Sequence, residues 1–179
     1  MGFTTTPSGA SCGATIDGVT LHEPLSSDLI AELRAQWLEH KVLIFPKQQL
    51  TPSHLVAFSE QFGEIGEDPF FGHINDHPKV AAVQRDAHEK TAIFAEIFHS
   101  DWSFLGVPPA GTVLYGITIP PIGGETLFAD QAMAYQQLPD DLRDRVEGLV
   151  AIHTAALGYW PVGGFGGDER AVGRRLWIG

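Results

Sequence analysis

Apolar residues recur at helical spacing in the first third of the chain. One helix is predicted over residues 26–40, where Ser26 or Ser27 supplies an N-cap. A second is predicted from Thr51 to Gly63, because Thr-Pro suits a helix start and glycine suits the position after its end. The apolar positions of the first helix are Leu29, Ile30, Leu33, Trp37 and Leu38. Each helix is therefore expected to cover a core with one face.

Runs of β-branched and apolar residues predict the strands. These runs are Val42–Phe45, Lys79–Arg85, Thr112–Ile119 and Glu125–Ala129. The first is expected to be buried. Shorter helices are predicted after Asp130, which can cap one of them, and from Pro139. The fold class is therefore mixed α/β and mainly β, and without a linker or repeat residues 1–179 are expected to form a single domain.

Composition and charge narrow the kinds of partner. The chain has 179 residues, 44% of them hydrophobic, which is enough for a sizeable core. Its 22 acidic and 11 basic residues give a formal net charge of −11, which disfavours a nucleic-acid partner. The single Cys12 cannot form an internal disulfide, and neither a signal peptide nor a membrane span is evident. We expect a cytoplasmic protein without a membrane partner.

Candidate chemistry begins at His99 and Asp101. In an extended chain side chains alternate, so these two would project from one face while Ser100 points away. An imidazole and a carboxylate so placed are two of the three protein ligands in a 2-His-1-carboxylate site for non-heme Fe(II). Alone, the same triplet also fits a surface turn with a salt-bridged histidine. Both interpretations stay open on spacing alone.

Further motifs follow the His-x-Asp triplet in order. They are Pro108-Pro109-Ala110-Gly111, Gly123-Gly124-Glu125-Thr126-Leu127-Phe128, and a helix with Ala134-Tyr135 that ends at Leu138-Pro139. Upstream lie Gly13–Val19, Val42–Phe45 and Phe62-Gly63. Together they resemble the TauD/TfdA family of Fe(II)- and 2-oxoglutarate-dependent dioxygenases, over roughly residues 10–155. Several motifs in order are far more specific than one triplet.

The resemblance implies a fold and an activity. The fold would be a double-stranded β-helix, the jelly-roll or cupin-like core, with flanking helices. His99 and Asp101 would bind Fe(II), and Thr126 would hydrogen-bond the distal carboxylate of the cosubstrate 2-oxoglutarate. With O2 the enzyme would hydroxylate a small organic substrate, anionic sulfonates and carboxylates included, and release succinate and CO2. A β-propensity threonine on a strand is the plain alternative for Thr126.

Three residues are candidates for substrate contact. His73 lies near the position of a substrate-contacting histidine in the sulfonate-using relatives, although a solvated loop histidine explains it equally. Trp102 and Phe104 can line a pocket or simply belong to the core. Ala95 stands where those relatives carry asparagine, which argues against taurine as substrate. His73 and His77 are four residues apart, but the segment is expected to be a loop without a second metal site.

The family's second histidine and its 2-oxoglutarate-binding arginine are expected far downstream. No residue here matches them. His153 corresponds to a non-ligand histidine, and Arg170, Arg174 and Arg175 lie in the glycine-rich tail 158–179, whose run Gly163–Gly167 is expected to be flexible. We therefore expect an N-terminal portion of a dioxygenase that lacks C-terminal strands and is poorly active.

Two alternatives come from other classes of protein. A shortened homologue can act as a binding module, or pair with a chain that supplies the missing strands. A zinc hydrolase can use His99, Asp101 and His153 to activate water. The sequence leaves the substrate and the oligomeric state open, a homo-oligomer included.

Overall fold

The computed structural model describes residues 2–66, 73–74, 76–86, 88–90 and 97–153, and the backbone of Gly173–Ile178. The strands in this part are β1 Thr4–Pro7, β2 Ala14–Asp17, β3 Leu43–Ile44, β4 His73–Ile74, β5 His77–Arg85, β6 Val113–Thr118 and β7 Gly173–Ile178. The helices are α1 Ser27–His40, α2 Pro52–Glu60, α3 Gln131–Gln136 and α4 Asp140–Val146. Ala95 and Arg170 lie outside the described residues.

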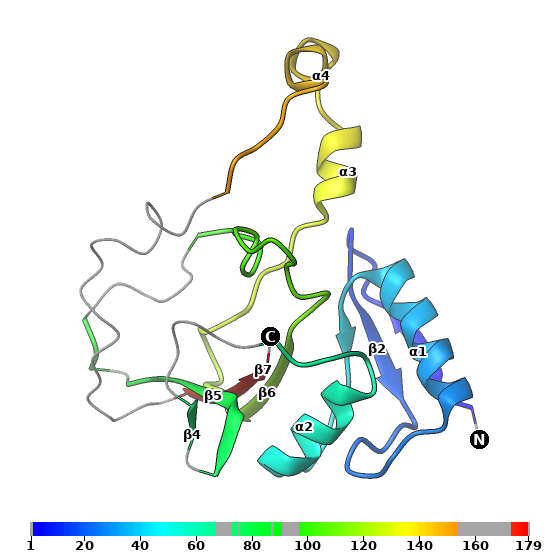
Figure 1. The fold of residues 1–179 in the computed structure, drawn as a ribbon, viewed down its shortest axis with the longest axis vertical. Coiled ribbons are helices and arrows are strands. Elements are labelled where there is room, and N and C mark those ends of the chain that lie inside the picture. The colour runs from blue at the N-terminus through cyan, green and yellow to red at the C-terminus, as the bar shows by residue number, and fades with distance from the viewer. Residues whose placement is uncertain are drawn as a thin grey trace.

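The first sheet has the order β1-β2-β3, and α1 lies beside it (Figure 1). The chain pairs β1 with β2 antiparallel and then crosses through α1 to add β3 parallel to β2. Helix α1 begins as predicted, because the Ser26 side chain accepts the Leu29 N–H. The predicted apolar stripe is wrong at Leu38, which is 78% exposed. The prediction that the strand at Val42–Phe45 is buried is also wrong, because β3 is an edge strand and its Ile44 is exposed.

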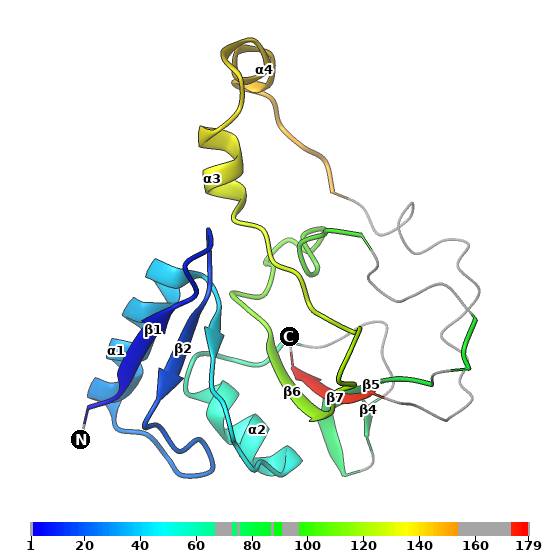
Figure 2. The ribbon, with the colours of Figure 1, turned by 180° about the vertical axis from the view of Figure 1, so that it is seen from behind.

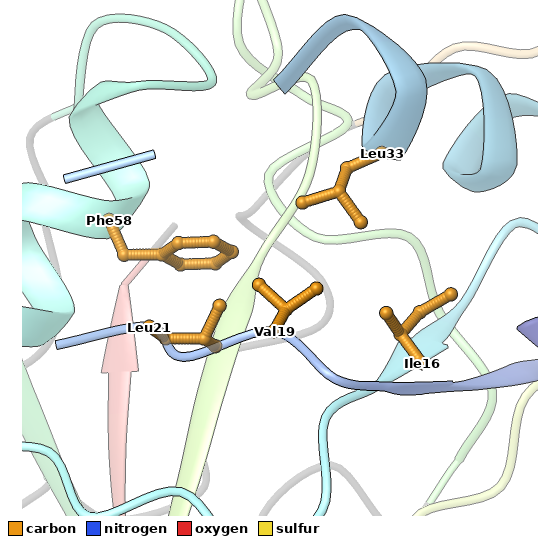
Figure 3. Close-up of a cluster of buried hydrophobic side chains, with 5 residues drawn as sticks. All are labelled: Ile16, Val19, Leu21, Leu33 and Phe58. Carbon is orange, nitrogen blue, oxygen red and sulfur yellow. The ribbon is translucent and has the colours of Figure 1, made fainter. Parts of the chain in front are cut away.

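Helix α2 contacts the first sheet on one side and strands β5, β6 and β7 on the other. Its start is fixed by reciprocal bonds, in which Thr51 Oγ1 accepts the His54 N–H and His54 Nδ1 accepts the Thr51 N–H. The helix ends at Glu60, three residues before Gly63, whose φ is 151°. The buried cluster that joins α1, α2 and the first sheet is Ile16, Val19, Leu21, Leu33 and Phe58 (Figure 3).

The second sheet has the order β4-β5-β7-β6, and all of its pairs are antiparallel. Strand β7 lies between β5 and β6, and the glycine run 163–167 that is predicted to be flexible lies outside the described residues. The loop predicted around His73 and His77 is wrong too, because β4 and β5 form a hairpin there. Its turn contains Asp76 at a φ of 66°. Val80 of β5 packs on Leu55 of α2, which joins the second sheet to the helix.

The last helices project away from both sheets (Figures 1 and 2). Asp130 caps α3 as predicted, accepting the N–H groups of Ala132 and Met133. The Tyr135 hydroxyl donates to the Glu147 carboxylate, which raises the pKa of Tyr135. Neither α3 nor α4 has a buried residue. The strand predicted at Glu125–Ala129 is wrong, because that segment is irregular.

None of the helices in the described residues combines enough length with enough apolar character to cross a bilayer.

Candidate metal centre

The His-x-Asp segment lies between β5 and β6, in a loop rather than the predicted strand. The backbone turns directly after Asp101, where the Leu105 N–H donates to the Trp102 carbonyl at 2.9 Å. The strand argument for side-chain alternation is therefore wrong. The two side chains nevertheless meet, because His99 Nε2 lies 3.1 Å from Asp101 Oδ1.

The imidazole of His99 is held between two acceptors. Nδ1 lies 2.9 Å from the carbonyl oxygen of Ile97, and Nε2 faces the Asp101 carboxylate. Both neighbours are acceptors, and a neutral imidazole carries one N–H, so it can donate to only one of them. The tautomer with Nδ1–H leaves Nε2 free to bind a metal ion. The tautomer with Nε2–H donates to Asp101, which is the plain histidine–aspartate pair that the spacing also allowed.

Asp101 is held from the other side. Its Oδ2 accepts a hydrogen bond from Thr112 Oγ1 at 2.7 Å, and Thr112 directly precedes β6. The carboxylate therefore joins the loop to the second sheet. The side chains of His99 and Asp101 are 37% and 35% exposed, so the donor atoms remain open to solvent on one side.

The donor separation suits one metal ion. Two donors on adjacent octahedral positions, each about 2.2 Å from the ion, stand about 3.1 Å apart. Imidazole nitrogen with carboxylate oxygen is the donor set of non-heme Fe(II) sites. The Nδ1–H of His99 on a backbone carbonyl is the usual support for a metal-binding histidine. Within the described residues, no three His, Cys, Asp or Glu side chains gather closely enough to hold a metal.

Trp102 anchors the loop. Its side chain is 4% exposed, and it is the one buried residue between positions 97 and 153. Its φ of 45° is rare for a bulky residue and costs about 1–3 kcal/mol. The burial of the ring offsets this strain and fixes the turn that follows Asp101. This burial gives Trp102 a packing role.

The other predicted residues lie on three different parts of the chain. His73 is exposed on β4, Phe104 is half-buried in the loop, and Thr126 is exposed in the irregular segment before α3. Nδ1 of His153 is 2.6 Å from Ser103 Oγ, so this histidine contacts the same loop without joining the metal ligands.

The start of α3 also supports the loop. Gln131 Nε2 donates to Ser100 Oγ at 3.0 Å. The neighbouring Asp130 is half-buried, and its Oδ2 lies 3.7 Å from Lys41 Nζ. The Met133 N–H, and then the charge of Lys41, hold the pKa of Asp130 below its usual range. Sequence reasoning missed Thr112 and Gln131, because no local signal marks a contact that only tertiary structure creates.

Comparison with known proteins now identifies the family. The protein-family model described as "Taurine catabolism dioxygenase TauD, TfdA family" matches residues 4–175 of this chain. The chain belongs to the TauD/TfdA family. This membership confirms the resemblance inferred from the motif order.

Similar TauD/TfdA proteins act on small organic acids. The (S)-phenoxypropionate/alpha-ketoglutarate-dioxygenase of Sphingobium herbicidovorans is 34% identical over 85% of this chain and 53% of its own length. The alpha-ketoglutarate-dependent 2,4-dichlorophenoxyacetate dioxygenase of Cupriavidus pinatubonensis is 34% identical over 79% of this chain and 55% of its own. A taurine dioxygenase structure from Burkholderia xenovorans superposes with a TM-score of 0.70 at 36% identity, covering 82% of this chain and 51% of that one. The chain thus spans about half the length of these relatives.

Proposed function

We propose that this protein is an Fe(II)- and 2-oxoglutarate-dependent dioxygenase that hydroxylates a small organic anion and releases succinate and CO2. The observation that carries the proposal is the convergence of His99 Nε2 and Asp101 Oδ1 at 3.1 Å, with Nδ1 already held by a carbonyl. The family membership and the relatives' activities support it. The proposed architecture is the family's jelly-roll core with flanking helices, to which the two sheets would belong.

Each residue has a proposed task. His99 binds the metal through Nε2 and Asp101 through Oδ1, while Thr126 donates its hydroxyl to the distal carboxylate of 2-oxoglutarate. Fe(II) held by these two residues would supply the oxidative chemistry with 2-oxoglutarate and O2. The buried Trp102 keeps the ligand loop in one conformation. The family's third metal ligand and its carboxylate-binding arginine would be needed beside these residues, and metal binding would be weak without them.

The proposed substrate class is aryloxyalkanoic acids or sulfate esters. The relatives named for phenoxypropionate and 2,4-dichlorophenoxyacetate support the first, and a sulfate ester dioxygenase from Pseudomonas putida at 30% identity supports the second. Ala95 argues against taurine, because it lacks the amide that the sulfonate-using relatives carry there. His73, Trp102 and Phe104 are the proposed substrate contacts.

The proposal is tested by measuring the binding of 2-oxoglutarate in the absence of O2, when turnover cannot occur. Under anaerobic conditions, an Fe(II) chelate of a 2-oxo acid absorbs visible light. We expect this band when the protein receives Fe(II) and 2-oxoglutarate, and we expect His99→Ala and Asp101→Ala to abolish it. A band of equal strength in both variants would reject the assignment. Hydrolysis supported by zinc without 2-oxoglutarate or O2 would favour the hydrolase alternative instead.

The partner-completed alternative has one supporting observation. Apolar side chains between positions 117 and 152 are exposed, and they include Ile117, Ile119, Ile122, Leu127, Phe128, Val150 and Ile152. Such a surface is typical of a site that packs against further polypeptide. Sedimentation of the pure protein distinguishes a self-associating or partner-bound chain from a monomer.

A further inference from the structure

We propose that Thr112 is a positioning residue that holds the Asp101 carboxylate in its metal-binding orientation. This inference rests on the proposed function, in which His99 and Asp101 bind Fe(II). Thr112 lies eleven residues after Asp101 and comes next to it only through the fold.

The hydrogen bond from Thr112 assigns different tasks to the two carboxylate oxygens. Thr112 Oγ1 donates to Oδ2 of Asp101 at 2.7 Å, a short bond to a charged acceptor. The terminal torsion of aspartate is broad and roughly two-fold, so a free carboxylate turns readily. With Oδ2 held, Oδ1 stays directed at His99 Nε2. The metal-binding geometry therefore exists before an ion arrives.

The position of Thr112 is itself fixed from both sides. Before it, Gly111 lies against the indole of Trp37, so closely that an added Cβ would be 2.3 Å from Cζ2. After it, Val113 packs against both buried clusters of the core. These contacts restrain the backbone on both sides of Thr112 and so hold its hydroxyl in place.

The two ligands are supported by independent elements. The carbonyl of Ile97 orients His99 from within the loop, whereas Thr112 orients Asp101 from the start of β6. Removing the Thr112 hydroxyl should therefore disturb Asp101 and leave the contact between His99 and Ile97 in place. Groups that orient metal ligands typically change metal affinity by about 10–100-fold.

The test compares Thr112→Val with two matched variants. Thr112→Ser keeps the hydroxyl, and Thr118→Val removes a hydroxyl from the far end of β6, the strand that follows Thr112. Mn(II), a spectroscopic substitute for Fe(II), is titrated by electron paramagnetic resonance. The ¹³Cγ shift of Asp101 and the ring ¹⁵N shifts of His99 are measured by NMR without metal.

We expect Thr112→Val to weaken Mn(II) binding at least about 10-fold and to move the Asp101 ¹³Cγ signal, and Thr112→Ser to restore both. Thr118→Val should match the parent. Equal Mn(II) affinity in Thr112→Val and parent, or an unmoved ¹³Cγ signal, would overturn the role of Thr112 while leaving the metal site intact. No Mn(II) binding by the parent would instead reject the metal site and, with it, this role.

Discussion

Among the glycines whose surroundings the structure describes, Gly111 leaves the least room for a side chain, because the indole of Trp37 lies against it. Replacing Gly111 with alanine would place a Cβ 2.3 Å from Cζ2 and 2.6 Å from Cη2 of the indole. Ordinary carbon contacts are about 3.5–4.0 Å, so ring and strand must separate by more than about 1 Å. Rotation of the ring is restrained, because Trp37 Nε1 donates to the Lys41 carbonyl at 3.0 Å and the indole packs against Phe62 in a T-shaped arrangement.

The expected loss of stability for Gly111→Ala follows from this crowding. Overpacking of this kind costs about 1–3 kcal/mol, and the entropic benefit of replacing glycine offsets at most about 1 kcal/mol. We therefore expect a net loss of about 1–2 kcal/mol, or several degrees in Tm for a chain of this size. Because Thr112 follows directly, Mn(II) affinity should also fall.

Urea unfolding followed by circular dichroism measures the loss. Gly106→Ala is the matched control, since a Cβ there has nothing within 4 Å, and it should stay within about 0.5 kcal/mol of the parent. In a Trp37→Leu background the clash is relieved, so Gly111→Ala should cost less there than in the parent. An equal cost in both backgrounds would refute the steric argument.

Three further predictions concern the hydrophobic core, the half-buried Asp130 beside Lys41, and the exposed apolar side chains. Leu33→Ala removes a fully buried side chain from the main cluster and should lower the free energy of unfolding by about 2–5 kcal/mol in the same urea experiment, whereas Leu38→Ala should change little. Asp130→Asn keeps the helix cap but loses the charge beside Lys41. Since the folded pKa of Asp130 lies below its usual 3.8, the parent should have the higher Tm above about pH 4, and the difference should vanish as pH falls through the lowered pKa. A difference that persists at pH 2 would contradict the charge argument. The exposed apolar side chains of residues 117–152 should bind a hydrophobic dye, and Ile122→Lys with Ile152→Lys should reduce the fluorescence without loss of Tm.

Local signals predicted the elements whose boundaries are set locally. The starts of α1, α2 and α3 are fixed by Ser26, Thr51 and Asp130, and each bond spans two or three residues. The strand predictions failed where a segment becomes a strand only through pairing with a distant part of the chain. Glu125–Ala129 has strand-forming residues without strand pairing, whereas residues 173–178 become a central strand because β5 and β6 flank them.

The candidate site likewise combines a contact that local sequence predicted with one that depends on tertiary structure. The pairing of His99 with Asp101 was predicted, but from strand alternation, whereas the structure brings them together through a turn anchored by Trp102. The spacing happens to give the same neighbours in both conformations. Thr112 could not be predicted, because its contact with Asp101 depends on how Gly111 packs on α1.

Anaerobic titration calorimetry with Fe(II) measures whether His99 and Asp101 bind one shared ion. The proteins compared are the unmutated chain, His99→Ala, Asp101→Ala and the double variant. We expect one weakly bound ion per chain in the unmutated protein, an affinity at least about 10-fold lower in each single variant, and little further loss in the double variant. Equal affinity in all four proteins would show that the two side chains do not bind the ion together.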